Sequence, residues 1–252
     1  MQQPTNTDLR LAVLIDADNV PAKAIHGMIS EIANYGKPTI KRIYGDFTSN
    51  RLNGWKGVLN EHAITPMQQY SYTTGKNASD SALIIDAMDM LHLANVDGFF
   101  IVSSDSDFTR LATRLRESGK LVFGMGQQKT PEAFIKACEK FIYLEVLMPP
   151  KPPATSGKAA ASATAKPISR LDAPMTKAII AAVEGLADEN GWVHMGRMGD
   201  AILKQRSDFD VRNFGYKKLS DLLSAIPELR VESRENDKGV KNLCVKVREK
   251  LR

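Results

Sequence analysis

The stretch Leu11-Ala-Val-Leu-Ile15-Asp16-Ala-Asp18-Asn19 decides the fold. Five consecutive apolar residues without polar alternation are typical of a short strand that is buried on both faces, as in a parallel sheet. Residues 20–35 follow with apolar side chains at helical spacing. The chain therefore opens with a buried strand that ends in two acids and leads directly into a helix.

Strand and helix signals continue to alternate as far as residue 147. Further strands are expected at 39–44, 63–69, 99–103, 121–125 and 141–147, with helices between them at 51–62, 79–94, 107–118 and 131–138. Such alternation with short connections predicts a three-layer α/β/α sandwich around a mostly parallel sheet. In such sheets, ligands bind beyond the carboxyl ends of the strands, near the point where the strand order reverses.

Residues 149–173 are rich in Pro, Ala, Ser and Lys and nearly lack large apolar residues, which predicts a flexible linker. It separates a first domain, 9–148, from a second domain, 174–248. In the second domain we expect helices at 175–189, 195–204 and 216–226, followed by a hairpin of strands 229–232 and 243–247. Three helices and a hairpin predict a winged helix-turn-helix.

Composition narrows the class of protein. The chain has 252 residues, of which 43% are hydrophobic and 25% charged, so it is not disordered as a whole. No apolar run reaches the length of a membrane span, and the polar start lacks the apolar core of a signal peptide. Two distant cysteines cannot build a disulfide framework or a cysteine-based zinc site. We therefore expect a cytoplasmic protein with no membrane partner.

The net charge of +5 is unevenly distributed. Residues 149–174 carry four Lys or Arg against one Asp, and residues 246–252 carry four against one Glu, so each segment holds three excess positive charges. This placement suits loose attraction to a polyanion such as RNA. Ordinary solubilising charge explains it equally well.

Four acids are predicted to meet at one edge of the sheet. Asp16 ends the first strand, and Asp105 and Asp107 follow the strand 99–103. Asp80 opens the helix 79–94. Crowded carboxylates repel one another and need a cation, and Mg²⁺ or Mn²⁺ prefers oxygen ligands. Each acid alone could instead be a turn or helix cap, and His26, His62 and His92 lack metal-ligand spacing and are interpreted as structural.

Three motifs carry a resemblance to a known family. Residues 14–19, Lys76–Asp86 and Val102–Phe108 resemble the NYN domain, a PIN-like nuclease family that includes the LabA/DUF88 group. The resemblance implies a PIN-like α/β/α sandwich and metal-dependent cleavage of RNA phosphodiesters by Asp16, Asp80, Asp105 and Asp107, with Mg²⁺ or Mn²⁺. Asn19, Asp86 and Ser103 match supporting motif positions. Ser104 stands where the family often has Gly.

RNA, in single-stranded form, is the expected partner. Lys76, Arg110 and Arg114 are candidate phosphate contacts, since Arg110 and Arg114 share one helix face. Residues 174–248 resemble the OST-HTH (LOTUS) domain, a winged helix that binds RNA or contacts proteins, so a protein partner is a second possibility.

Two other functions compete with a ribonuclease. The first is a non-catalytic RNA- or protein-binding regulator that retains a residual metal site. The second is a haloacid-dehalogenase-like phosphatase, because Asp16-x-Asp18 after a strand resembles its nucleophile and acid. That fold places a hairpin flap after the pair, whereas here Pro21 leads into a helix and the usual Thr is missing.

Overall fold

The computed structural model describes residues 9–70, 78–148, 167–169, 171–235 and 241–248. The chain divides into two compact units, Met1–Met148 and Pro149–Arg252, and each is described by itself. Most of the expected linker, 149–173, lies outside the described residues.

The first unit is built on a six-stranded sheet, as the alternation of apolar runs predicted. The strands are β1 (Arg10–Asp16), β2 (Lys37–Gly45), β3 (Thr65–Gln68), β4 (Gly98–Val102), β5 (Leu121–Gly126) and β6 (Lys140–Tyr143). They are ordered β3-β2-β1-β4-β5-β6, and each neighbouring pair is parallel. The order reverses between β1 and β4, so a ligand site is expected beyond the carboxyl ends of these two strands.

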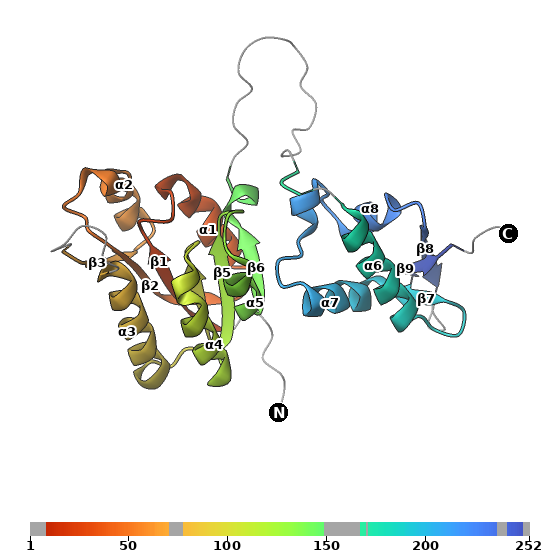
Figure 1. The fold of residues 1–252 in the computed structure, drawn as a ribbon, viewed down its shortest axis with the longest axis horizontal. Coiled ribbons are helices and arrows are strands. Elements are labelled where there is room, and N and C mark those ends of the chain that lie inside the picture. Colours follow the sequence, from red (N-terminus) through yellow and green to blue (C-terminus); the bar gives the residue numbers. More distant parts are fainter. Residues whose placement is uncertain (1–8, 71–77, 149–166, 170, 236–240, 249–252) are drawn as a thin grey trace, which may run out of the picture. The chain divides into compact units, whose positions relative to one another are not determined.

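Helices cover both faces of this sheet (Figure 1). On β1, Leu11, Val13 and Ile15 pack into one core with α1 (Ile25–Ile32) and α2 (Asn53–Glu61). Strand side chains alternate between faces, so Ala12 and Leu14 point to the opposite face. The helices α3 (Ala78–Leu93), α4 (Thr109–Glu117) and α5 (Glu132–Ala137) lie outside the first core and complete the α/β/α sandwich.

Two elements of the first unit differ from the sequence-based expectation. The first helix begins as a 3-10 turn, Ala22–Ala24, after Pro21, and becomes α-helical only at Ile25. The last strand was expected to reach residue 147, but β6 ends at Tyr143 and the chain turns into a 3-10 helix, Leu144–Val146. The turn carries Leu144 into the core of the α1 and α2 face, so burial of this side chain outweighs continuation of the strand.

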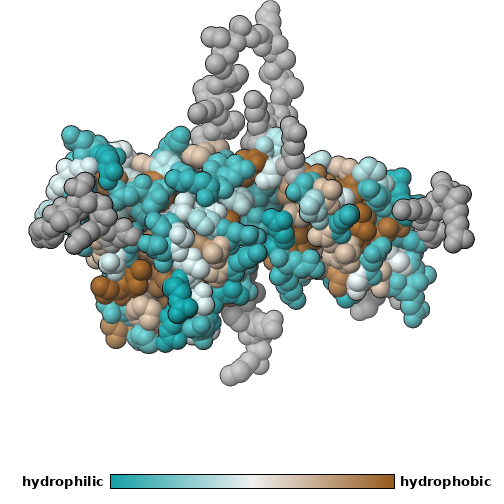
Figure 2. Space-filling view, viewed as in Figure 1, coloured by the Kyte–Doolittle hydropathy of each residue, from teal (hydrophilic) through white to brown (hydrophobic). Residues whose placement is uncertain are grey.

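The helix α3 is apolar on more than its buried side. Leu83, Ala87 and Met90 are buried, whereas Ile85 and Leu93 are exposed. Figure 2 shows the resulting hydrophobic patch over α3. Among the described residues, no helix is long and apolar enough to cross a membrane.

The second unit is a winged helix-turn-helix with one more strand than expected. Its helices are α6 (Ala173–Leu186), α7 (Met195–Gln205) and α8 (Leu219–Ser224), and its strands are β7 (Trp192–His194), β8 (Leu229–Glu235) and β9 (Lys241–Val247). The strands pair antiparallel in the order β7-β9-β8. Asp172 caps α6 by accepting a hydrogen bond from the Met175 amide at 2.9 Å. The sequence did not reveal β7, because three residues are too few to show an alternating pattern.

Candidate metal centre

Asp16 is the buried acid of the site. It ends β1, and only 1% of its surface is exposed. Its Oδ2 accepts hydrogen bonds from Ser103 Oγ and Asn19 Nδ2, both at 2.7 Å, and its Oδ1 accepts one from the Asp18 amide at 3.1 Å. Burial raises the pKa of Asp16, while these hydrogen bonds act to lower it. Both oxygens are thus held in one orientation at the edge of the sheet.

Ser103 connects the ends of β1 and β4. Its hydroxyl donates to Asp16 and accepts a hydrogen bond from the Asp105 amide at 3.1 Å. The neighbouring strand β5 approaches so closely that a Cβ at Gly126 would lie 2.5 Å from the Ser103 carbonyl oxygen. Ser103 is therefore enclosed, and its hydroxyl fixes Asp105 relative to Asp16.

Asp105 begins the 3-10 helix Ser106–Phe108 as its N-cap. Its carboxylate accepts a hydrogen bond from the Asp107 amide at 2.9 Å. Asp105 and Asp107 thus leave β4 in a fixed turn, with Asp107 exposed to solvent. Asp105 is therefore both a helix cap, which was the alternative interpretation, and one of the acids at this edge of the sheet.

Three carboxylates converge at this edge. Oxygens of Asp80, Asp105 and Asp107 lie within 4.8 Å of one another. Burial, and then repulsion by Asp16, Asp105, Asp107 and Asp18, raise the pKa of Asp80 to about 6. The structure thus brings Asp80, Asp105 and Asp107 together. Asp16 is not in this group of three, but its charge acts on Asp80.

The donor set suits a hard divalent cation. The three converging groups are all carboxylates, which Mg²⁺ and Mn²⁺ prefer as ligands. Burial, and after it the repulsion by neighbouring acids, raises the pKa of Asp80, so its charged form is disfavoured at this position. A divalent cation held by Asp80, Asp105 and Asp107 would relieve this repulsion.

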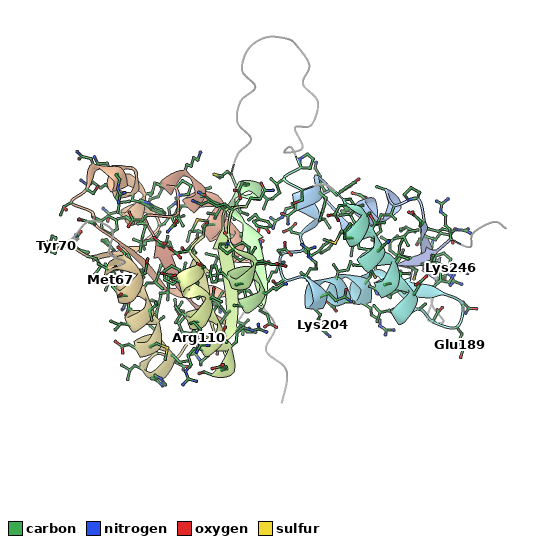
Figure 3. The ribbon with its side chains drawn as sticks, in the orientation of Figure 1. Met67, Tyr70, Arg110, Glu189, Lys204 and Lys246 are labelled. Carbon is green, nitrogen blue, oxygen red and sulfur yellow. The ribbon has the colours of Figure 1, made fainter. Side chains whose placement is uncertain are left out.

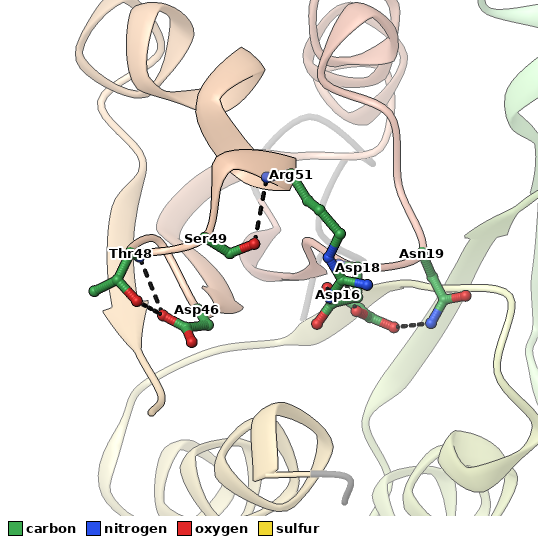
Figure 4. Close-up of polar contacts among 7 residues, drawn as sticks. All are labelled: Asp16, Asp18, Asn19, Asp46, Thr48, Ser49 and Arg51. Carbon is green, nitrogen blue, oxygen red and sulfur yellow. Dashed lines mark hydrogen bonds and ion pairs between the residues drawn. The ribbon is translucent and has the colours of Figure 1, made fainter. Parts of the chain in front are cut away.

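An ion pair borders the site. Asp18 follows Asp16 on the loop after β1, and Arg51 Nη2 contacts its Oδ1 at 2.9 Å (Figure 4). Both residues, with Asn19 and Trp55, line a pocket of about 350 Å³. On the same loop as Arg51, Asp46 accepts hydrogen bonds from the amide and hydroxyl of Thr48. The arrangement places an exposed guanidinium beside the carboxylates, where a phosphate could reach it.

The remaining candidate residues do not belong to the group of three carboxylates. Asp86 is bound by Arg42 Nη1 and by the Tyr44 hydroxyl, both from β2. Arg110 is exposed at the start of α4 (Figure 3), and Arg114 lies 4.0 Å from Glu117. Asp86 is therefore bound to side chains of β2. Lys76, the remaining candidate, lies outside the described residues.

Sequence reasoning missed a second group of possible ligands. His26, Glu61 and His62 each offer one ligand atom within 4.8 Å of the others, and the two imidazole centroids are 5.7 Å apart. The residues come from α1 and from the end of α2, and no local spacing joins them. A search for histidines separated by one helical turn could not have found this pair.

Two family models and several solved structures match parts of this chain. The OST-HTH/LOTUS domain model matches residues 167–241. A protein of unknown function from Vibrio parahaemolyticus is 17% identical, with a TM-score of 0.49, and covers 58% of this chain and 99% of its own. An uncharacterized Nitrosomonas europaea protein is 31% identical, with a TM-score of 0.31, over 40% of this chain and 95% of its own. A Chromobacterium violaceum protein is 23% identical, with a TM-score of 0.26, over 32% and 87%.

A comparison with curated proteins finds no match. The NYN domain model matches residues 10–145, more than half of the chain and all six strands of the first unit. The chain therefore belongs to the NYN domain family, with an OST-HTH/LOTUS domain after the NYN domain.

Proposed function

We propose that this protein is a metal-dependent endoribonuclease that hydrolyses phosphodiester bonds of single-stranded RNA. The observation that carries the proposal is the convergence of Asp80, Asp105 and Asp107 beyond β1 and β4, together with the raised pKa of Asp80. The NYN family supports nuclease chemistry, and the OST-HTH/LOTUS domain supports RNA as the ligand.

Each acid has a role that follows from its surroundings. Asp80, Asp105 and Asp107 would hold Mg²⁺ or Mn²⁺, which when bound supplies a Lewis acid that lowers the pKa of water and stabilises the charge on a phosphoryl oxygen. Asp16, which is fixed by Ser103 and Asn19, is the fourth proposed acid of the site. In this proposal the exposed Asp107 would also accept a hydrogen bond from the attacking water.

Basic side chains would hold the RNA backbone beside the acids. Arg51 borders the cluster, and its ion pair with Asp18 is exposed enough for a phosphate to compete for the guanidinium. Arg110 projects from the first turn of α4, shortly after Asp107. Together with Arg114 and Lys76, these residues are the proposed phosphate contacts of the first unit.

A basic surface on the second unit would recruit RNA. Arg230, Lys246 and Arg248 line a pocket of about 640 Å³ with Trp192. Lys246 belongs to β9 (Figure 3). The Arg234 guanidinium lies 4.8 Å from the centroid of the Trp192 ring. Basic groups around an aromatic ring suit single-stranded RNA, because phosphates bind the cations and bases stack on rings.

The activity is tested with purified protein, single-stranded RNA and duplex RNA, in Mn²⁺, in Mg²⁺ and in EDTA. We expect cleavage of the single strand that requires the metal and is lost in Asp105→Asn. Asp89→Asn, which removes an exposed acid of α3 outside the cluster, is the matched control and should retain activity. If no metal supports cleavage although the protein binds RNA, the regulator is the better description. Hydrolysis of small phosphomonoesters in place of RNA would favour the phosphatase.

The proposed domains, 9–148 and 174–248 joined by the linker 149–173, are tested by deleting residues 149–252. We expect metal-dependent cleavage of short RNA to persist while binding to longer RNA weakens. The linker and tail carry excess positive charge, so RNA binding by the truncated chain should also depend less on salt. The slope of log affinity against log salt concentration should fall by about 0.7 for each phosphate of a single strand that is no longer neutralised. Complete loss of cleavage of short RNA by the truncated chain would contradict this division.

A further inference from the structure

Two helices of the first unit bring two imidazoles and a carboxylate together. His26 is the second residue of α1, Glu61 is the last residue of α2, and His62 is the C-cap of α2. One ligand atom of each lies within 4.8 Å of those of the other two. The imidazole rings meet edge to face at an interplanar angle of 63°.

The backbone under these side chains is firmly held. Ile25 and Leu59 are buried in the same core, which anchors α1 and α2 to one face of the sheet. The carbonyl oxygen of His62 accepts a hydrogen bond from the Lys41 ammonium. Ala63 then adopts the left-handed conformation at φ 50°, and the Ile64 amide closes the helix end on the Leu59 carbonyl at 2.9 Å. His62 therefore cannot move far from His26 without breaking this helix end.

The carboxyl end of α2 favours a cation at this position. Carbonyl groups at the carboxyl end of a helix carry partial negative charge, and Glu61 and His62 lie at that end of α2. Within the described part of the chain, Glu61 forms no ion pair, and the neighbouring Lys41 ammonium is bound to the His62 carbonyl oxygen.

We propose that His26, Glu61 and His62 form a binding site for a zinc-class divalent metal ion that ties α1 to α2. Two imidazole nitrogens and one carboxylate oxygen are a donor set for Zn²⁺, whereas Mg²⁺ prefers oxygen alone. Tetrahedral ligands at about 2.0–2.1 Å from the ion lie about 3.4 Å apart. His26 and Glu61 are exposed and His62 is half-buried, so small side-chain rotations from the observed separation suffice, and water takes the fourth position.

This site is distinct from the carboxylate cluster. Its residues belong to α1 and α2, on one face of the sheet, whereas Asp80 belongs to α3, outside that core. The two sites also differ in chemistry, since the converging acids offer oxygen ligands only. A metal ion bound here would hold α1 and α2 together. Because these helices follow β1 and β2, the ion would also support the loops that carry Asp18 and Arg51.

Calorimetric titration of the untagged full-length protein with Zn²⁺ tests the proposal, after removal of bound metal with a chelator. All proteins carry Cys244→Ser, because this free thiol is only partly buried. We expect one site whose affinity falls at least about tenfold in His26→Gln and in His62→Gln, the lower end of the loss known for supporting groups at metal sites. His92→Gln, an exposed histidine at the end of α3, and Asp105→Asn should retain it.

Thermal unfolding gives a second measurement. Zn²⁺ should raise the Tm of the parent protein and of His92→Gln, and this rise should be lost in both imidazole variants. If circular dichroism shows that either histidine variant fails to fold, Glu61→Gln, a substitution at an exposed residue, replaces that variant in both measurements. Equal zinc affinity in the parent and in the ligand variants, absence of zinc binding, or loss of the site only in Asp105→Asn would each overturn the proposal.

Discussion

Replacing Asp80 by Asn should stabilise the metal-free protein while it removes a proposed metal ligand. Burial and four nearby acids raise the pKa of Asp80 from 3.8 to about 6. The native state therefore keeps this proton at pH values where the unfolded chain has lost it. Stability is greatest below the unfolded pKa, falls as the pH rises from about 4 to about 6, and is level above that window. Asn carries no charge and avoids this loss.

The magnitude follows from the same pKa. A difference between 3.8 and about 6 corresponds to about 3 kcal/mol at 1.36 kcal/mol per pH unit. Asp80 is only half-buried, and solvent screens part of the repulsion, so about half of this value, 1–2 kcal/mol, is expected at pH 8. Below about pH 3.5 the gain should vanish, because both states then hold the proton.

Urea unfolding in EDTA measures this effect on the first unit alone. Trp55 is buried there, and Trp192→Phe removes the other tryptophan, so fluorescence then reports on Trp55. Asp89→Asn is the control for removing an exposed acid from the same helix. Mg²⁺ should stabilise the parent more than Asp80→Asn. The reasoning is refuted if Asp80→Asn gains no more than Asp89→Asn at pH 8, or if its gain persists at pH 3.5.

Three further changes have definite expected outcomes. Asp105→Asn should lower cleavage at least about a hundredfold. It should keep or raise RNA affinity, because a charge that repels phosphate is removed. Gel-shift and cleavage assays on one RNA check this, and weaker binding would contradict it. Ser103→Ala should cost about 1–3 kcal/mol by removing a donor from buried Asp16, with a lower urea midpoint as the readout. Ala63→Gly should raise the free energy of unfolding by up to about 1 kcal/mol, since glycine tolerates φ 50°; an unchanged or lower urea midpoint would show that residue 63 is unstrained.

The parallel sheet could be predicted because its strands are continuous apolar runs. Leu11–Ile15 and Phe99–Val102 are fully buried and leave little choice of secondary structure. The acids at the strand ends followed from the topology, since parallel strands present their carboxyl ends at one edge. Their convergence was therefore foreseeable before any distance was known.

Contacts between distant side chains could not be predicted in the same way. Asp16 and Asp80 were both predicted as metal-binding acids. The sequence does not show that Ser103 and Asn19 donate hydrogen bonds to one oxygen of Asp16. The pairing of His26 with His62 depends on how α1 and α2 lie side by side. Such pairings depend on how helices and strands pack together, and the periodic pattern within one helix or strand does not predict them.

The contact of Asp86 with Arg42 and Tyr44 has a consequence for how variation in this chain should be interpreted. It joins α3 to β2 and so fixes the rotation of the helix whose first turn carries Asp80. In a mutational scan scored by activity, changes at Asp86 would rank with those at the cluster, although the three converging carboxylates do not include it. Substitutions at Arg42 and Tyr44 should covary with those at Asp86, whereas Asp105 should vary independently of all three. Coupling of this kind would separate the acid that orients a helix from the acids that face the ligand.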